Sequence, residues 1–139
     1  MDLPARHLLF HGAIILLIGL LAGIPYGKAI LRKQPEPLVH AWRVAHGSLV
    51  LGAALMIALS AAVSSLQVSL VLKQVLAAGF IVSAYGFAFA LILGPLVGAR
   101  GLQYQGSQAA RAVYLGNIVG VVGSLAGSLL LLYAAFVSL

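Results

Sequence analysis

Four long apolar runs, separated by short polar stretches, constrain this chain more than any other feature of its sequence. Each run is long enough for an α-helix to cross the hydrocarbon core of a bilayer, which takes about 20 residues. Hydrophobic residues make up 63% of the 139 residues, and charged residues only 7%. The runs also lack the apolar–polar alternation of barrel strands. The sequence therefore predicts an all-α fold, an integral membrane four-helix bundle that forms one transmembrane domain over residues 1–139.

The proline, glycine and polar residues between the apolar runs set the expected bounds of the helices. We expect helices over residues 4–24, 40–64, 68–93 and 109–138. Pro25 with Gly27, and Gly94 with Pro95, mark the expected ends of the first and third helices. The first run is followed by no A-x-A-type cleavage site, so we interpret it as a membrane helix and not as a cleaved signal peptide.

Small residues at helical spacing predict where the helices pack closely. Gly19 and Gly23 form a small-xxx-small pair in the first helix. The last helix carries two GxxxG pairs on adjoining faces, made by Gly116, Gly120, Gly123 and Gly127. We expect one of these faces to pack within the bundle and the other to meet another protomer.

The charged residues orient the chain and exclude several function classes. The expected loops over 26–38 and 98–108, with the helix ends beside them, hold most of the cations: Lys28, Arg32, Lys33, Arg43, Arg100 and Arg111. The opposite side holds Arg6 and Lys73, so the positive-inside rule predicts that both loops are cytoplasmic and both termini outside, in a bacterial-type inner membrane.

The placement of the charged residues and the lack of cysteine exclude several classes of partner, cofactor and activity. The scattered cations form no basic cluster with interleaved aromatics, so nucleic acid is not an expected partner. The chain has no cysteine and therefore no disulfides, thiolate ligands or iron–sulfur clusters. Its only acidic residues, Asp2 and Glu36, lie outside the membrane core, which argues against a proton-coupled exporter that needs an intramembrane carboxylate.

His46 is the most informative single residue, because it lies well inside the second apolar run. A histidine at membrane depth is costly unless it has a partner or a task, and neutral imidazole is a common ligand of haem iron. Arg43 precedes it by one helical turn on the same face. The alternative is a structural histidine that hydrogen-bonds a carbonyl or faces headgroups.

Depth arithmetic separates His46 from the other deep histidine, His11. At about 1.5 Å of rise per residue, the two imidazoles differ in height by roughly 20 Å. They cannot both ligate one iron in one subunit, so a haem on His46 would keep an open sixth position. His7 and His40 belong to the interfaces, and we expect His11 to hydrogen-bond across to a neighbouring helix.

Further cofactor-binding candidates follow from the same heights. Asn117 lies level with His46 on the fourth helix, and Tyr114 lies one turn nearer the loops. Arg43, Arg100 and Arg111 lie above this level, and arginine suits the carboxylates of haem propionates. The alternative for each arginine is a loop charge that only orients the chain.

Three short motifs resemble styrene oxide isomerases: Phe10-His11-Gly12, Trp42-x-x-Ala45-His46 and Arg100-Gly101-Leu102. This resemblance implies a trimer of four-helix membrane proteins that binds haem b near its subunit interfaces, with His46 in the place of the axial ligand. It also implies that ferric haem acts as a Lewis acid on the oxygen of an epoxide. The epoxide ring opens, a hydride shifts, and the aldehyde product leaves.

The pocket residues of that family do not carry over. Gly52 stands where the family has an asparagine, and Ser83 and Leu91 stand where it has an aspartate and a tyrosine. Tyr85 or Asn117 could supply a replacement hydrogen bond. The hypotheses are therefore a haem b protein acting on small hydrophobic epoxides, a non-catalytic haem sensor, store or carrier, and a structural small membrane subunit without haem.

Overall fold

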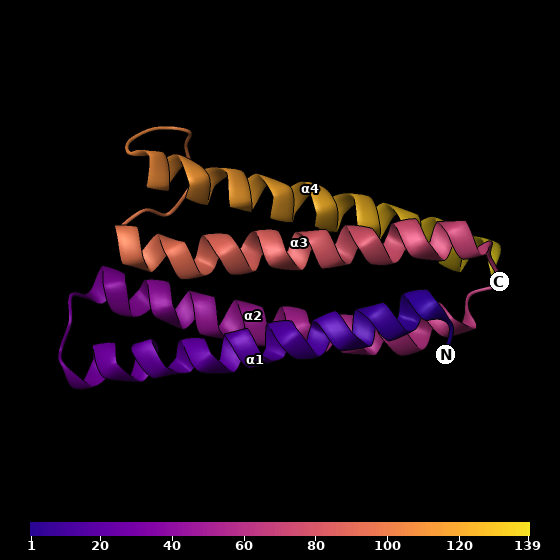
Figure 1. Ribbon diagram of the computed structural model, residues 1–139, viewed down its shortest axis with the longest axis horizontal. Coiled ribbons are helices and arrows are strands. Elements are labelled where there is room, and N and C mark those ends of the chain that lie inside the picture. Colours follow the sequence, from indigo (N-terminus) through magenta and orange to yellow (C-terminus); the bar gives the residue numbers. More distant parts are fainter.

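The computed structural model describes residues 1–139 as four α-helices: α1 (Leu3–Leu31), α2 (Glu36–Ser65), α3 (Leu70–Val97) and α4 (Gln108–Val137). All four are long and apolar enough to cross a membrane. They run up and down as long rods, with both chain termini at the same end (Figure 1). The expected all-α architecture, with four helices long and apolar enough to span a membrane, is confirmed.

The helices form two closely packed pairs, which contact each other through α3. Helix α1 packs along α2, and α3 packs along α4, while both α1 and α2 also contact α3. Helix α4 contacts α3 alone, and it forms the outermost layer of the bundle in Figure 1. One side of α3 is therefore left open between α2 and α4.

The helices are longer than the proline positions predict. Helix α1 passes through Pro25 and continues to Leu31, and α3 passes through Pro95 and ends only at Gly98, which is left-handed with φ 67°. Ala29, near the end of α1, is buried in one cluster with residues from the start of α2. In lipid the backbone has no water to bond, and neighbouring helices sustain a helix past a proline. The predicted ends at Pro25 and Gly94-Pro95 are therefore wrong.

The first loop is correspondingly short. Only residues 32–35 separate α1 from α2, because α2 already begins at Glu36 with Pro37 in its first turn. Proline is tolerated there, since the first turn has no intrahelical partner for its backbone donors. The predicted polar connection over 26–38 is therefore mostly helical.

Glycines bring the backbones of each pair into contact. A Cβ on Gly19 would lie 2.9 Å from the backbone nitrogen of Val50, which confirms the predicted close contact of α1. A Cβ on Gly86 of α3 would lie 2.8 Å from the backbone nitrogen of Gly120. All the α4 glycines of the two GxxxG pairs face α3: Gly116, Gly120, Gly123 and Gly127. The expectation that one of these glycine faces is free for another protomer is therefore wrong.

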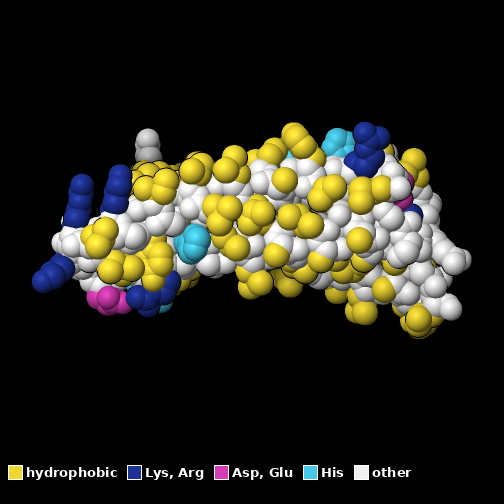
Figure 2. All heavy atoms as spheres, turned by 90° about the horizontal axis from the view of Figure 1, so that it is seen from below, with side chains coloured by type: hydrophobic (Ala, Val, Ile, Leu, Met, Phe, Trp, Pro, Cys, Tyr) yellow, Lys and Arg dark blue, Asp and Glu magenta, His cyan; other side chains and the backbone are white.

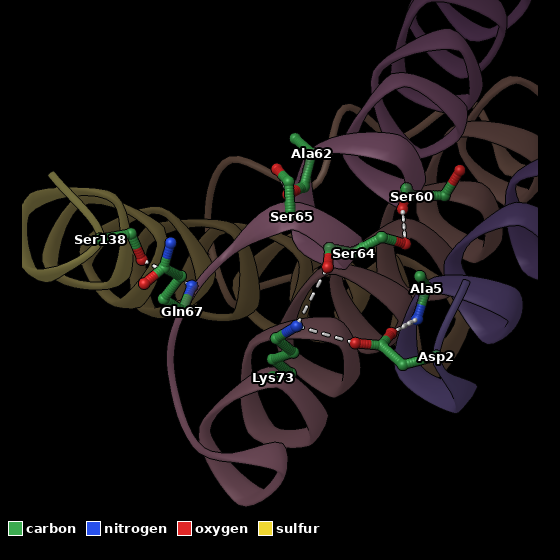
Figure 3. Close-up of polar contacts among 9 residues, drawn as sticks. All are labelled: Asp2, Ala5, Ser60, Ala62, Ser64, Ser65, Gln67, Lys73 and Ser138. Atoms are coloured by element: carbon green, nitrogen blue, oxygen red, sulfur yellow. Dashed lines mark hydrogen bonds and ion pairs between the residues drawn. The ribbon is translucent and has the colours of Figure 1, made fainter.

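A buried ion pair joins the helix ends at the side of the termini (Figure 3). Lys73 of α3 is only 8% exposed, and its Nζ donates to Asp2 Oδ2 at 2.9 Å and to the Ser64 carbonyl at 3.3 Å. Asp2 also caps α1 by accepting from the Ala5 backbone N–H. The hydrogen bond from Lys73 lowers the pKa of the Asp2 carboxyl, although burial acts in the opposite direction. One carboxylate thus fixes the start of α1 against α2 and α3.

On the face that Figure 2 shows, apolar side chains are spread along the length of the molecule, and the charged side chains gather at its two ends. Dark blue cations are most numerous at one end, and this end carries the α1–α2 loop. A surface of this kind fits a lipid bilayer around the bundle. The assignment of that end to the cytoplasm remains a prediction from the cation count.

Candidate functional site

The imidazole of His46 is held by the backbone of α1. Its Nδ1 lies 2.8 Å from the carbonyl oxygen of Gly19. A carbonyl can only accept, so Nδ1 must carry the hydrogen, and a neutral ring then has its lone pair on Nε2. The two alternatives for His46, a carbonyl bond and an iron ligand, are thus compatible, because they use different nitrogens.

Two further residues of α1 surround this ring. A Cβ on Gly23 would lie 3.2 Å from Nδ1 and 3.3 Å from Cε1, so the imidazole fills the space that this glycine leaves. The ring of Tyr26 lies nearly parallel to it, with the centroids 6.2 Å apart and the planes at 27°. We call Gly19, Gly23 and Tyr26 the imidazole cradle. The three residues share one face of α1, since they follow one another at helical spacing.

Arg43 extends this group toward the charged end of the bundle. Its Nε donates to the hydroxyl of Tyr26 at 3.1 Å, and its guanidinium lies 3.7 Å from Glu36 Oε1. The Arg43 side chain is 52% exposed, so the guanidinium remains accessible from outside the helix pair. Of the predicted propionate partners, Arg43 is the one that the structure places beside His46.

The other predicted cofactor contacts lie elsewhere in the chain. Arg111 lies over the ring of Tyr104, with 5.4 Å from its Cζ to the centroid, and Tyr114 packs edge-on against the same ring. Arg100 lines a cavity between α2 and α3. A single chain therefore does not bring Arg100, Arg111 and Tyr114 to the ring of His46.

His11 has a different kind of partner. Its Nδ1 lies 2.9 Å from the Tyr85 hydroxyl on α3, which confirms the expected bond to a neighbouring helix. The contacts of His46 with Gly19 and Gly23 place its ring about 12 to 18 Å from the level of His11, at about 1.5 Å of rise per residue. The two imidazoles are therefore apart, as the depth arithmetic predicts, although somewhat closer than expected.

A cavity of about 420 Å³ lies on the open side of α3, facing α2 and α4. Gly52, Leu91 and Asn117 from the predicted site line it. Apolar side chains supply most of the remaining wall, with Ser48 as the added polar residue: Ile15, Leu49, Leu51, Leu55, Ala84 and Phe87. The volume falls within the usual range of small-molecule sites, about 300–1,000 Å³.

Two predicted pocket residues do not line this cavity. Ser83 is buried, and its Oγ donates to the Gly120 carbonyl at 2.6 Å, so it ties α3 to α4. The Tyr85 hydroxyl lies at His11 and not in the cavity. Tyr85 therefore does not supply to this cavity the replacement hydrogen bond that the sequence suggested.

Asn117 serves the connection between α3 and α4. Its Nδ2 donates to the carbonyls of Arg100 and Gly101, at 3.2 and 3.1 Å. Gly101 has φ 64°, and a Cβ there would lie 2.7 Å from Asn117 Nδ2, so the motif Arg100-Gly101-Leu102 closes tightly over α4. With both N–H groups engaged, the amide of Asn117 has only its oxygen left for a ligand.

A larger cavity, about 630 Å³, continues toward the charged end of the bundle. It shares Leu91 and Asn117 with the first cavity and reaches His40, Val44 and Arg100. The imidazole of His46 lines neither cavity. The ring of His46 and the two cavities therefore lie on different faces of α2.

Sequence reasoning missed the imidazole cradle. Gly19 and Gly23 carry a packing signal only, and Tyr26 was expected in a loop because of Pro25. No signal in a sequence marks a backbone carbonyl as the partner of a particular side chain. The structure contains no cluster of three His, Cys, Asp or Glu side chains that could hold a metal ion.

Comparison with known proteins gives one match. A family model described as styrene oxide isomerase matches residues 4–136, which is nearly the whole chain. No curated protein and no solved structure matches the chain.

Proposed function

This chain belongs to the styrene oxide isomerase family, and from that membership we propose that it binds haem b through His46 and isomerises small hydrophobic epoxides to carbonyl compounds. The observation that carries the proposal is the bond from His46 Nδ1 to the Gly19 carbonyl. Histidines that ligate metals usually donate their second N–H to such an acceptor, which fixes the tautomer and orients the ring. When bound, ferric haem would supply a Lewis acid for the epoxide oxygen.

The residues present fit this cofactor at two points. His46 offers Nε2 as a neutral donor, with its hydrogen fixed on the other nitrogen. Arg43 lies one turn closer to the charged end and can pair with a propionate, since guanidinium binds carboxylates in a planar, bidentate manner. These two residues would hold the haem from the α1–α2 side.

The division of the site between two faces of α2 supports a haem held between copies of the chain, and the number of three copies comes from the family resemblance alone. Within one chain the ring of His46 contacts α1, whereas Ser48, Gly52 and Leu55 of the same helix line the cavity toward α3. A cofactor that meets both His46 and an apolar cavity therefore needs the cavity of a second copy. This arrangement agrees with the haem position near subunit interfaces that the family resemblance implies.

The chain contributes binding and exclusion of water to the proposed reaction, and no acid–base catalysis. Both acidic residues lie at the ends of the bundle, where Asp2 pairs with Lys73 and Glu36 with Arg43. The cavity walls are largely apolar, which favours small hydrophobic molecules over polar ones. An isomerisation without net proton uptake suits such a site.

One observation favours a second candidate, a non-catalytic haem sensor, store or carrier. Asn117 and Tyr85, which were expected to orient a substrate, are engaged with the α3–α4 connection and with His11. A cavity that has lost these donors holds an epoxide less firmly than the pocket of an established isomerase.

The two candidates are distinguished by spectroscopy followed by turnover. Protein purified from haem-replete cells is expected to show a Soret band, and a panel of hydrophobic epoxides is expected to give aldehydes. A Soret band with no aldehyde from any epoxide would select the non-catalytic haem protein. No Soret band would leave a structural membrane subunit and remove both candidates. Native mass spectrometry in mild detergent tests the trimer, and a monomer would contradict it.

A further inference from the structure

Ser48 brings an unpartnered hydroxyl to a largely apolar cavity. It is exposed, and it lines the 420 Å³ cavity on the face of α2 that turns away from His46. Its Oγ makes no hydrogen bond within the chain. The hydroxyl of Ser128 on α4 also makes none, but Ser128 lines neither cavity. Other serines inside the helices donate to a backbone carbonyl: Ser60, Ser64, Ser65, Ser83 and Ser124.

The space next to this hydroxyl is open. Gly52 follows Ser48 by one turn on the same face, and a Cβ at Gly52 would meet no atom within 4 Å. Phe87 and Leu91 of α3 form the opposite wall. A small ligand can therefore lie over Gly52 with one of its atoms within reach of Ser48.

The remaining polar group of the cavity cannot act as a donor. Both N–H groups of Asn117 are directed to the carbonyls of Arg100 and Gly101, so its amide presents an acceptor. The hydroxyl of Ser48 is thus the donor available to a ligand at this site. In hydrocarbon a hydroxyl without a partner is unfavourable, so a ligand with an acceptor oxygen gains from meeting it.

We propose that Ser48 is the specificity-determining residue of this cavity, where its hydroxyl donates to the oxygen of a small, neutral, hydrophobic ligand. The ligand class is a one-ring molecule with one acceptor oxygen, such as an aryl epoxide or the carbonyl compound made from it. The assignment rests on the proposed function for the identity of this ligand. Ser48 itself binds and orients, and it transfers no proton.

A matched pair of probes tests the assignment without turnover. 4-Fluoroacetophenone carries an acceptor oxygen, and 1-fluoro-4-isopropylbenzene has nearly the same shape without one. Their dissociation constants are measured by ¹⁹F NMR on the haem-replete protein in lipid nanodiscs, after correction for partition into lipid. The ketone is expected to bind about fivefold more tightly than the oxygen-free probe, as one net hydrogen bond allows.

Variants separate the hydroxyl from the shape of the cavity. Ser48→Ala is expected to abolish the ketone preference, Ser48→Thr to retain it, and Gly52→Leu to weaken both probes equally by filling the space. Ser128→Ala on α4 is the matched control and is expected to leave the preference unchanged. An unchanged ketone preference in Ser48→Ala would overturn the assignment. Equal binding of both probes to the wild type would also overturn it, and a lipid acyl chain that occupies the cavity would give this result.

The two proposals fail separately. Loss of the preference in Ser48→Ala without any Soret band would support the role of Ser48 while contradicting haem binding. A Soret band with no Ser48-dependent preference would contradict the role of Ser48 and leave haem binding in place.

Discussion

His46 and His11 are both imidazoles at membrane depth, and they differ in what their Nδ1 atoms contact. Nδ1 of His46 faces a carbonyl, which only accepts, whereas Nδ1 of His11 faces the Tyr85 hydroxyl, which donates or accepts. The first partner fixes the tautomer and frees Nε2, and the second leaves the tautomer open. The partner of Nδ1, more than the depth of the ring, therefore determines which histidine presents a free Nε2 lone pair.

The surroundings of the two rings differ in the same direction. Gly23 leaves room for the imidazole of His46, and Tyr26 lies along it. His11 instead stacks on His7 of its own helix and lies edge-on to Phe10 and to Tyr85 of α3. One ring lies in a shaped cradle of a neighbouring helix, and the other lies in an aromatic cluster at the surface.

The largest expected effect breaks the comparison directly. His46→Ala removes the proposed iron ligand and is expected to abolish the Soret band of the purified protein. His11→Ala removes a surface hydrogen bond and is expected to retain the band at full intensity. Haem content per protein, measured by absorbance, checks both, and equal loss in the two variants would refute the distinction between them.

The next effect concerns the shape of the cradle. Gly23→Ala puts a methyl group about 3.2 Å from Nδ1, so the imidazole must shift by a few tenths of an ångström. A ring displaced from the Gly19 carbonyl ligates iron less well, because second-shell partners typically change metal affinity 10–100-fold. Haem titration of the apoprotein measures the effect. Gly27→Ala on the same helix, where a Cβ meets nothing within 4 Å, is the control and should match the wild type.

A smaller effect concerns stability at the end of the bundle nearest His11. Asp2→Asn leaves the buried ammonium of Lys73 without its carboxylate and is expected to destabilise the fold by about 1–2 kcal/mol, seen as a lower midpoint of thermal unfolding. The Soret band should not move, since this end lies far from His46.

The same pair predicts a pH dependence. The pKa of Asp2 is lowered from its ordinary value of 3.8 in the folded chain, so its stabilising contribution is present above that value and is lost as the pH falls through the lowered pKa. The wild type is therefore expected to lose its advantage over Asp2→Asn in strong acid. A difference between the two proteins that is constant from pH 7 to pH 2 would contradict the ion pair as its cause.

The smallest expected effect is that of Tyr85→Phe. It removes the hydroxyl at His11 Nδ1 and should lower stability by about 1 kcal/mol or less, because the bond is exposed. Haem content and epoxide turnover should be unchanged. A loss of turnover would instead show that Tyr85 serves the reaction, against the position that the structure gives it.

The membrane spans could be predicted from the sequence because lipid accepts few structures, but their ends could not. A proline ends many helices in water, where solvent can bond the backbone groups that the proline leaves without a partner. In this chain Ala29 is buried against the start of α2, and this packing sustains α1 beyond the proline. The prediction used propensity rules drawn from soluble helices. It therefore ended the first helix too early and placed Tyr26 in a loop.

The sequence singled out His46 as the candidate residue, but it did not predict the residues that surround the ring. His46 is conspicuous because a polar residue at depth needs a reason, and spacing identified Arg43 beside it. Residues at the same height around a bundle, such as Asn117 and Arg111, can face different partners, and height alone does not distinguish them. The donors around a ring come from tertiary contacts, which one sequence does not encode locally.

The packing of α1 on α2 also bears on how the protein is made. The contacts that orient the imidazole come from Gly19, Gly23 and Tyr26, all of which precede His46 in the chain. An α1–α2 hairpin that packs as it does in the full bundle would orient the ring before α3 is synthesised. The cavity lined by Gly52 and Leu91 also needs α3 and would therefore form later.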